Sequence, residues 1–139
     1  MAEIKFTVPG VPVGKGRPRV TSHGTYTPQK TRAYEEKVRL CWETQSGVSL
    51  PSGVPLMAEL RAYFPIPKSA SKRRREAMEG AFHTARPDCD NVAKAILDSL
   101  NGFAYHDDSA VQLGRVWKLY TSGAPRVDVQ IWEAGRGRT

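Results

Sequence analysis

The sequence predicts a single small α+β domain that spans residues 1–139. The length is typical of one domain. Several segments alternate apolar and polar residues as strands do, and others carry apolar stripes at helical spacing. These segments follow one another in the order β-loop-α-β-α-α-β-β. We therefore expect a mixed β-sheet of about four to five strands with two to three helices.

The N-terminal part of the chain is expected to begin with a strand and a long loop. Residues 3–8 alternate, with Ile4, Phe6 and Val8 on one face. Residues 9–27 are rich in Gly and Pro. A loop of this length inside a compact domain is usually functional or disordered.

A first helix is predicted from about residue 28 to residue 45. Thr27 and Pro28 form a typical helix start, with a capping residue followed by Pro at the first helical position, and Gly47 is suited to end the helix. One face of this helix carries Tyr34, Val38, Cys41 and Trp42.

The middle of the chain predicts a second strand and a short basic helix. Residues 54–64 alternate again, and Pro65 and Pro67 stop the strand. Ser69 or Ser71 is placed to cap a short helix that contains four successive cations, Lys72, Arg73, Arg74 and Arg75.

The C-terminal half contains the clearest helix and two further strands. Residues 88–101 carry one apolar stripe at helical spacing, Val92, Ala93, Ile96, Leu97 and Leu100. Gly102 stands where a helix-ending glycine is expected. Residues 111–120 and 126–133 alternate around a Ser-Gly-Ala-Pro turn and are predicted to form a terminal hairpin.

The charge indicates a polyanionic partner. The chain has 21 Lys and Arg against 14 Asp and Glu, a net charge of +7, and such a balance suggests nucleic acid. Residues 1–86 hold 15 basic and 7 acidic side chains, whereas all six aspartates follow residue 86. We expect no secretory signal, no membrane span and, with only Cys41 and Cys89, a protein of the reducing cytoplasm.

Two groups of aspartates stand near the ends of the strong helix. Asp88 and Asp90 flank Cys89 at its start, and Asp107 and Asp108 follow it. Capping and turn formation are ordinary roles for such residues. Several carboxylates without a His or Cys cluster, however, are the ligands that Mg²⁺ prefers. On a basic protein, this set indicates metal-assisted phosphodiester hydrolysis.

The remaining candidates are cations. Lys94 follows Asp90 by one helical turn and either pairs with it on the helix surface or stabilises charge on a reacting phosphate. The cations expected to contact DNA phosphates are Lys15, Arg17, Arg19, Lys72, Arg73, Arg74, Arg75 and Arg86. For the run at residues 72–75, a merely solvated basic helix is the alternative. No zinc spacing, Walker loop or Rossmann glycine pattern is present.

The segment Arg86–Leu100 resembles the D-x-D-N-x-x-K-x-x-x-D-x-L signature of RusA-type Holliday junction resolvases, carried here by Asp88, Asp90, Asn91, Lys94, Asp98 and Leu100. Gly102-Phe103 and the paired Asp107-Asp108 resemble that family's continuation. The Gly14–Arg19 stretch is similar to phage and prophage members. The resemblance extends from about residue 4 to residue 133.

The resemblance implies a small homodimeric Mg²⁺-dependent endonuclease, for which Mn²⁺ can substitute, that resolves four-way DNA junctions. It implies that Asp88, Asp90 and Asp108 are catalytic metal ligands with Lys94 as the essential lysine, and that Asp107 is a further candidate ligand. It implies a cytoplasmic bacterial or phage-encoded protein that needs no small-molecule cofactor. Paired nicks suit a dimer, because a two-fold dimer presents two identical sites to a nearly two-fold junction.

Two other functions remain open at this point. One is a PD-(D/E)xK-type nuclease, which Pro87-Asp88 and Asp128-Val129-Gln130 faintly resemble although the final lysine is missing. The other is a non-catalytic basic DNA-binding module, in which the aspartates only cap helices and form turns. Incubation of the protein with a labelled junction, with and without Mg²⁺, separates binding from cutting.

Overall fold

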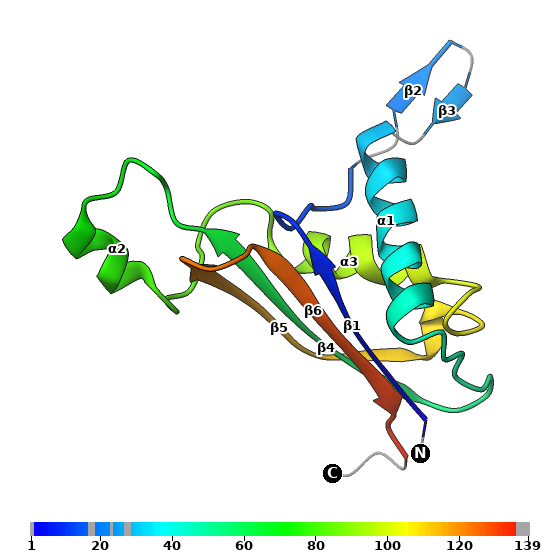
Figure 1. Cartoon of the computed structure of the whole chain (residues 1–139). Helices are drawn as coiled ribbons and strands as arrows, with labels where there is room; N and C mark the ends of the chain where they lie inside the picture. Colours follow the sequence, from blue (N-terminus) through cyan, green and yellow to red (C-terminus); the bar gives the residue numbers. More distant parts are fainter. Residues whose placement is uncertain (1, 17–18, 23, 27–28, 136–139) are drawn as a thin grey trace.

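A computed structural model describes residues 2–16, 19–22, 24–26 and 29–135 (Figure 1). Within these ranges the chain forms a four-stranded mixed sheet, a separate two-stranded hairpin and three α-helices. The expected α+β class is therefore confirmed. No helix in the described ranges is long and apolar enough to cross a membrane.

The main sheet has the order β1-β6-β4-β5. Its strands are β1 (Glu3–Pro9), β4 (Leu56–Pro65), β5 (Val111–Thr121) and β6 (Arg126–Glu133). Strand β6 is antiparallel to both β1 and β4, whereas β5 is parallel to β4. The sheet is thus built from both ends of the sequence, and the first and last described strands are hydrogen-bonded neighbours.

The terminal hairpin predicted from residues 111–133 is wrong. Strands β5 and β6 exist where the alternation predicts them, but β4 lies between them and pairs with both. The four-residue connection 122–125 passes the end of β4, where the backbone N–H of Ile66 donates to the carbonyl of Thr121 at 3.3 Å. Alternation reports which face of a strand is buried and does not report its neighbour, so the sequence pattern fits either arrangement.

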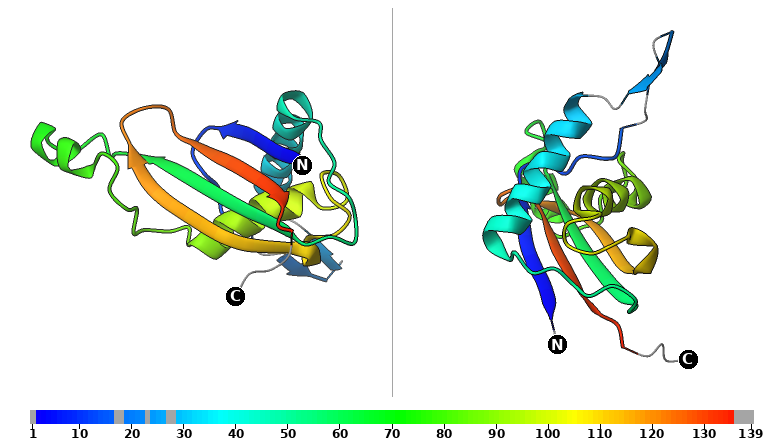
Figure 2. Two further views of the ribbon diagram at one scale, coloured as in Figure 1. Left: turned by 90° about the horizontal axis from the view of Figure 1, so that it is seen from below. Right: turned by 90° about the vertical axis from the view of Figure 1, so that its right-hand side faces the viewer.

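Helices α1 (Gln29–Gln45) and α3 (Cys89–Leu100) cover one face of the sheet (Figure 2). The predicted apolar faces supply the core, which contains Tyr34, Val38 and Trp42 of α1, Val92, Ala93, Ile96 and Leu100 of α3, and the inward residues of β1, β4 and β6. Cys41 and Leu97 pack at its margin. Gly47 (φ +67°) and Gly102 (φ +81°) follow the two helices in the left-handed region that favours glycine.

Two short elements project from this body (Figure 1). Strands β2 (Arg19–Thr21) and β3 (Gly24–Tyr26) form a hairpin inside the segment expected to be a plain loop. Helix α2 (Lys72–Met78) has no buried residue, and the Oγ of Ser71 accepts a hydrogen bond from the backbone N–H of Arg74 at 3.2 Å, which confirms the serine cap. The start predicted for the first helix, Thr27 and Pro28, lies outside the described residues.

The outer edge of β1 is closed by a side chain of α1. The Gln45 amide accepts from the backbone N–H of Thr7 at 2.8 Å and donates to the carbonyl of Thr7 at 2.7 Å. A free strand edge is prone to pair with another chain, and this amide occupies the edge of β1 at Thr7. The face of the sheet opposite the helices is left without a covering helix (Figure 2, left).

Candidate functional site

The start of α3 presents two carboxylates. Asp88 is the N-cap, and its Oδ1 accepts a hydrogen bond from the backbone N–H of Asn91 at 2.9 Å. Asp90 lies in the first turn and is exposed. The capping role is real for Asp88, but it uses only one carboxylate oxygen. The second oxygen of Asp88 and the whole carboxylate of Asp90 are available for a cation.

The segment before Asp88 is held against β5 by Lys118. The Lys118 ammonium donates to the carbonyl oxygens of Ala85 and Pro87, both at 2.7 Å. The Arg86–Pro87 peptide bond is cis. Because the carbonyl of Pro87 directly precedes the cap residue and that of Ala85 lies two residues earlier, Lys118 helps to fix the direction in which the chain enters α3.

A ring stack at His83 holds the same segment slightly earlier in the chain. The imidazole of His83 stacks on Phe64, with centroids 3.8 Å apart, and contacts Tyr120 at 5.0 Å. Burial, with a smaller contribution from the nearby Lys118 charge, lowers the pKa of His83. The ring is therefore a neutral packing group at neutral pH, and it joins the path to Asp88 to the sheet.

The N-terminal loop lies beside the start of α3. The backbone N–H of Lys15 donates to the carbonyl of Asn91 at 3.1 Å. A Cβ at Gly14 would lie 2.7 Å from the Cβ of Pro87, so only glycine permits this close approach. Between the loop and α3 is an open hollow of about 1090 Å³, whose lining includes Lys30, Arg86 and Asp88.

The side chain of Lys15 joins three elements. Its ammonium lies 2.7 Å from Oε1 of Glu35 on α1 and 3.3 Å from Oδ2 of Asp98 on α3. Burial opposes the charge, but the hydrogen bonds to the two carboxylates outweigh it and raise the pKa of Lys15. The predicted DNA contact of Lys15 stays a prediction, and in this structure its charge is directed at carboxylates.

The second aspartate group lies at the other end of α3. The backbone N–H of Asp108 donates to Oδ1 of Asn101 at 3.2 Å, and Tyr105 OH donates to the carbonyl of Leu97. These contacts bring Asp108 to the flank of α3 that carries Asp98. Burial, and then the charges of Asp107 and Asp98, raise the pKa of Asp108.

The pKa of Asp107 is shifted in the opposite direction to that of Asp108. Its Oδ2 accepts a hydrogen bond from the Ser109 hydroxyl at 2.7 Å. This hydrogen bond, together with backbone N–H groups at Asp108 and Ser109, lowers the pKa of Asp107. Asp107 is therefore ionised at neutral pH, and its charge adds to the crowding around Asp108.

The structure places the predicted metal ligands in two groups. Asp88 and Asp98 are ten residues apart along α3, which corresponds to about 15 Å of helix, and Asp108 is near Asp98. In the described ranges no three His, Cys, Asp or Glu side chains are arranged to hold a metal ion. A shared metal site for Asp88, Asp90, Asp107 and Asp108 therefore stays a prediction.

Lys94 lies on α3 between the two aspartate groups. It is exposed, and among the described residues no carboxylate lies within 4.0 Å of its ammonium. The alternative role considered for Lys94, a surface ion pair with Asp90, is thus not formed in this structure. Its charge is available to a bound phosphate.

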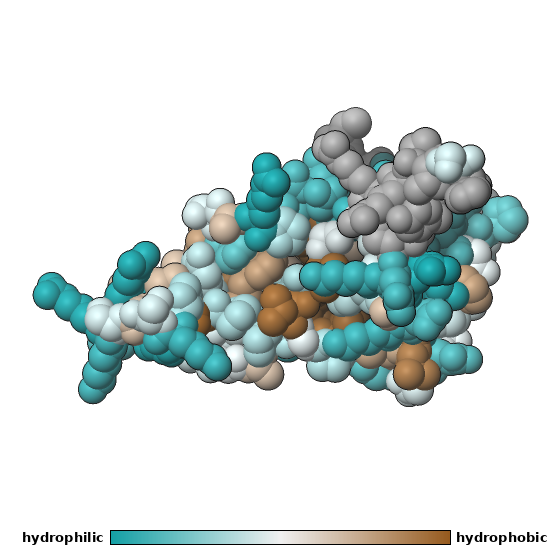
Figure 3. Space-filling view, turned by 90° about the horizontal axis from the view of Figure 1, so that it is seen from above, coloured by the Kyte–Doolittle hydropathy of each residue, from teal (hydrophilic) through white to brown (hydrophobic). Residues whose placement is uncertain are grey.

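The remaining predicted DNA contacts lie on α2, in the segment before α3 and in the N-terminal segment. Lys72, Arg73 and Arg74 are exposed on α2, Arg75 donates to the carbonyl of Ala70 at 3.2 Å, and Arg86 is exposed. Figure 3 shows hydrophilic side chains over most of this side of the molecule, with those of α2 projecting at the left. Arg17 lies outside the described residues, and for Arg19 only the backbone in β2 is described.

Two residues of the site were not assigned to it from the sequence. Asp98 belongs to the aspartate-rich signature and shares a helix flank with Asp90 and Lys94, so its i, i+8 spacing was an available signal. Lys118 gave no signal, because an isolated lysine in an alternating strand is typical of a solvated position. Only the fold brings it to the chain before Asp88.

Helix and sheet thus define a small α+β protein with carboxylates at both ends of α3 and exposed cations on α2 and α3. The family model for endodeoxyribonuclease RusA matches residues 9–132. The chain therefore belongs to the RusA endodeoxyribonuclease family. It is also 37% identical over 138 residues to the uncharacterized protein YqaN of Bacillus subtilis (strain 168), covering 94% of this chain and 96% of that protein.

Proposed function

We propose that this protein is a Mg²⁺-dependent endonuclease that resolves four-way DNA junctions by paired symmetric nicks. The observation that carries the proposal is that Asp98, Asp107 and Asp108 lie together beside α3, where burial and then the charges of Asp107 and Asp98 raise the pKa of Asp108. Carboxylates that repel one another in this way gain most from a bound cation. Membership of a family of endodeoxyribonucleases supports DNA as the substrate.

The residues proposed to hold the metal are Asp88, Asp90 and Asp108, with Asp107 as a further candidate. All are oxygen donors, which suit Mg²⁺, and Mn²⁺ accepts the same ligands. A bound divalent ion would polarise the scissile phosphate and lower the pKa of an attacking water. Asp98 contributes negative charge beside Asp108 and is partly neutralised by Lys15.

The cations have two proposed tasks. Lys94, exposed between the two aspartate groups, stabilises charge that develops on the phosphate. Cations away from α3 bind the DNA backbone without regard to sequence, and Lys72, Arg73 and Arg74 of α2 are exposed for this task. Lys15 and Arg86 line the hollow beside Asp88, and these two cations, together with Arg17 and Arg19, are the further proposed DNA contacts.

We further propose that the active unit is a homodimer in the bacterial cytoplasm, of bacterial or phage origin. A four-way junction has nearly two-fold symmetry, and its resolution requires two opposed nicks. A two-fold dimer supplies two identical sites in that relation. No small-molecule cofactor is required for this reaction.

A second candidate function is favoured by one observation. Asp88 does cap α3, as it would in a non-catalytic DNA-binding module. The test is incubation of the protein with an end-labelled synthetic junction, with Mg²⁺ and with EDTA. Cutting that requires Mg²⁺ supports the nuclease, whereas binding without cutting under both conditions supports the module.

A further inference from the structure

A large hollow lies between the N-terminal loop, the start of α1 and the start of α3. Its volume is about 1090 Å³, and Asp88, a proposed metal ligand, is among its lining residues. Ligand pockets in proteins commonly measure about 300–1,000 Å³, so this hollow has room for a whole nucleotide. A ligand that fills it is held directly beside the proposed site of cleavage.

The loop that forms one wall of the hollow is anchored at both ends. The backbone N–H of Gly10 donates to the carbonyl of Pro125 at 2.9 Å. The backbone N–H of Lys15 donates to the carbonyl of Asn91 at 3.1 Å, and its ammonium adds ion pairs with carboxylates on α1 and α3. The hollow is therefore formed before a ligand arrives, and a pre-formed site loses little free energy to ordering.

The surface of the hollow has an apolar part and a cationic part. The apolar part consists of loop residues 11–13, with Val11 53% exposed, and of Pro87 before α3. The cationic part includes Lys30 of α1 and Arg86, which are both exposed. A nucleotide has the same two parts, because its base has apolar faces and its phosphate is negative.

Two cations of the hollow are not paired within the protein. Among the described residues, no carboxylate lies within 4.0 Å of Lys30 or Arg86. With Lys15 included, the described lining carries three cations against the single carboxylate of Asp88. This excess of positive charge favours a ligand that carries a phosphate.

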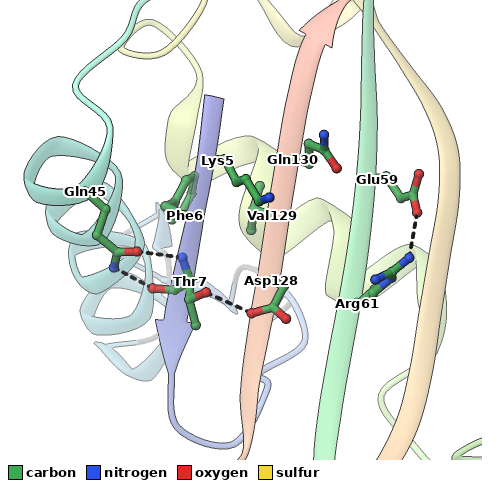
Figure 4. A pocket seen from close by; sticks show the side chains of 9 residues that line it. All are labelled: Lys5, Phe6, Thr7, Gln45, Glu59, Arg61, Asp128, Val129 and Gln130. Carbon is green, nitrogen blue, oxygen red and sulfur yellow. Dashed lines mark hydrogen bonds and ion pairs between the residues drawn. The ribbon is translucent and has the colours of Figure 1, made fainter. Parts of the chain in front are cut away.

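A second hollow, of about 460 Å³ on the uncovered face of the sheet, lacks this feature (Figure 4). Gln45 is hydrogen-bonded to the backbone of Thr7, and the Thr7 hydroxyl donates to Asp128 at 2.8 Å. Glu59 lies 3.5 Å from Arg61. Most polar side chains of that hollow are thus occupied by one another, whereas two cations of the hollow beside Asp88 remain available to a ligand.

The shape of the DNA decides which nucleotide is able to enter. In a duplex each base is stacked on both sides, so a protein reaches it only after extruding it from the stack. At a branch point the strand passes from one arm to another, and the stack is interrupted there. The cost of extrusion is smallest where a base is already unpaired or poorly stacked, so the hollow favours a nucleotide at the branch point.

We propose that the hollow beside Asp88 binds one unstacked nucleotide from the branch point of the DNA. Its base lies against Val11 and Pro87, and its phosphate lies near Lys30 and Arg86. The inference rests on the proposed function in that branched DNA is the substrate there. It adds a physical basis for selectivity, because a branched substrate offers a nucleotide to the hollow at low cost and a linear duplex does not.

The first test compares junction binding with duplex binding by fluorescence anisotropy in EDTA. Val11→Trp places a bulky side chain in the hollow at a half-exposed position outside the core. We expect its junction dissociation constant to rise about tenfold, which corresponds to the lost burial of about two methylene groups, and its duplex binding to be unchanged. The control Leu40→Trp, at a 59% exposed position of α1 that does not line the hollow, should bind both DNAs as the wild type does. Thermal unfolding confirms that each variant is folded.

The second test asks whether a base leaves the stack. The adenine analogue 2-aminopurine, whose fluorescence is quenched by stacking, is placed at each branch-point position in turn. No described lining residue is aromatic, so a base in the hollow should stay bright. We expect the wild-type protein to raise the fluorescence at a branch-point position and not at a position within an arm.

The third test combines a change in the DNA with the change in the protein. An abasic site at the position found with 2-aminopurine removes the base and keeps the phosphate. For the wild type it should weaken junction binding about tenfold, because the same apolar contact is lost. For Val11→Trp it should have no further effect, since the base is already excluded. Two changes that act on one contact are not additive, whereas independent changes are.

The cationic part of the hollow is tested by Lys30→Gln. Loss of this charge should weaken junction binding and lower the slope of log K against log salt by about 1, the value for one phosphate contact. Arg32→Gln is the matched control, because Arg32 is exposed on the same helix and does not line the hollow. Its slope should equal that of the wild type.

Several results would overturn the proposal. They are the absence of a fluorescence rise at every branch-point position, an abasic site without effect on the wild type, additive effects of the abasic site and Val11→Trp, equal losses of junction and duplex binding in Val11→Trp, and a wild-type salt slope in Lys30→Gln. All of these measurements are made without cleavage. A protein that shows the expected binding but never cuts would reject the proposed nuclease function and keep the nucleotide site. Mg²⁺-dependent cutting without the fluorescence rise would keep the function and reject the site.

Discussion

The ammonium of Lys118 lies 2.7 Å from the carbonyl oxygen of Pro87, the residue directly before the candidate metal ligand Asp88. The same ammonium holds Ala85 at an equal distance. A lysine in the sheet thereby holds the chain directly before the start of α3. Groups that orient metal ligands contribute measurably to metal affinity and activity.

We predict that Lys118→Met lowers Mg²⁺-dependent junction cleavage by about 10–100-fold, the usual cost of losing a group that orients a ligand. The apparent Mg²⁺ affinity should weaken as well, while junction binding is retained. A titration of cleavage rate against Mg²⁺ measures this effect. Lys68→Met, a change at an exposed lysine, is the matched control, and equal rates in both variants would remove the positioning role.

The raised pKa of Asp108 predicts a pH dependence of stability. A carboxyl whose folded-state pKa is above its unfolded value destabilises the fold when ionised, and this cost disappears as pH falls through the folded pKa. We therefore expect Asp108→Asn to unfold at a slightly higher temperature than the wild type at pH 7 without metal. At about pH 3, below the ordinary pKa of an aspartate, the difference should vanish.

The effect of Mg²⁺ on the melting temperature provides a second test of Asp108. A cation bound beside this carboxylate removes the repulsion, so Mg²⁺ should raise the melting temperature of the wild type more than that of Asp108→Asn. Differential scanning fluorimetry with and without Mg²⁺ is sufficient. Equal Mg²⁺ shifts in both proteins would show that Asp108 does not take part in binding the metal.

Most strands and helices can be predicted from the sequence, because the burial of one face gives the apolar residues a regular spacing along the chain. The alternation of Ile4, Phe6 and Val8 and the stripe of α3 both lie in the core as predicted. The hairpin of β2 and β3 was missed because three-residue strands are too short for a period. The neighbour of β5 was missed because alternation does not encode strand order.

The residues of the candidate site also fall into two kinds: those that a local sequence pattern predicts, and those that only the fold brings together. Asp88, Asp90 and Lys94 stand in one short signature, so the sequence alone predicts them as site residues. Lys15 and Asp98 are 83 positions apart, and their ion pair depends on how the N-terminal loop packs on α3. The same holds for Lys118, whose partners lie 31 and 33 positions earlier.

The cations of α2 are predicted to bind DNA phosphates. Replacing Arg73, Arg74 and Arg75 together with Ala should weaken binding to any DNA sequence and lower the slope of log K against log salt by about 1 per lost contact. Fluorescence anisotropy over a salt series measures the slope. Lys5→Ala, on the uncovered sheet face, should leave the slope as it is. A triple variant with the wild-type slope would mean that α2 is only a solvated basic helix.

Variants of Lys94 can distinguish a role in the reaction from a role only in surface ion pairing. Since no ion pair with Asp90 is formed, Lys94→Ala should change the free energy of unfolding by less than about 0.5 kcal/mol. If its charge stabilises the reacting phosphate, the single-turnover rate should fall by about 10²–10³-fold. Lys94→Arg should keep DNA binding but restore little cleavage, because a guanidinium does not reproduce a compact ammonium. Wild-type rates in a folded Lys94→Ala protein would refute the role.

The most direct test of the proposed metal-dependent nuclease is the Asp90→Asn variant. Asp90 is exposed in the first turn of α3, so Asn should preserve the fold while removing the charge that a metal requires. The measurement is single-turnover cutting of a labelled four-way junction at saturating protein and Mg²⁺, with junction binding measured in parallel. The account predicts that cutting is lost and that binding is unchanged or tighter. Near-normal Mg²⁺-dependent cutting by Asp90→Asn would contradict it.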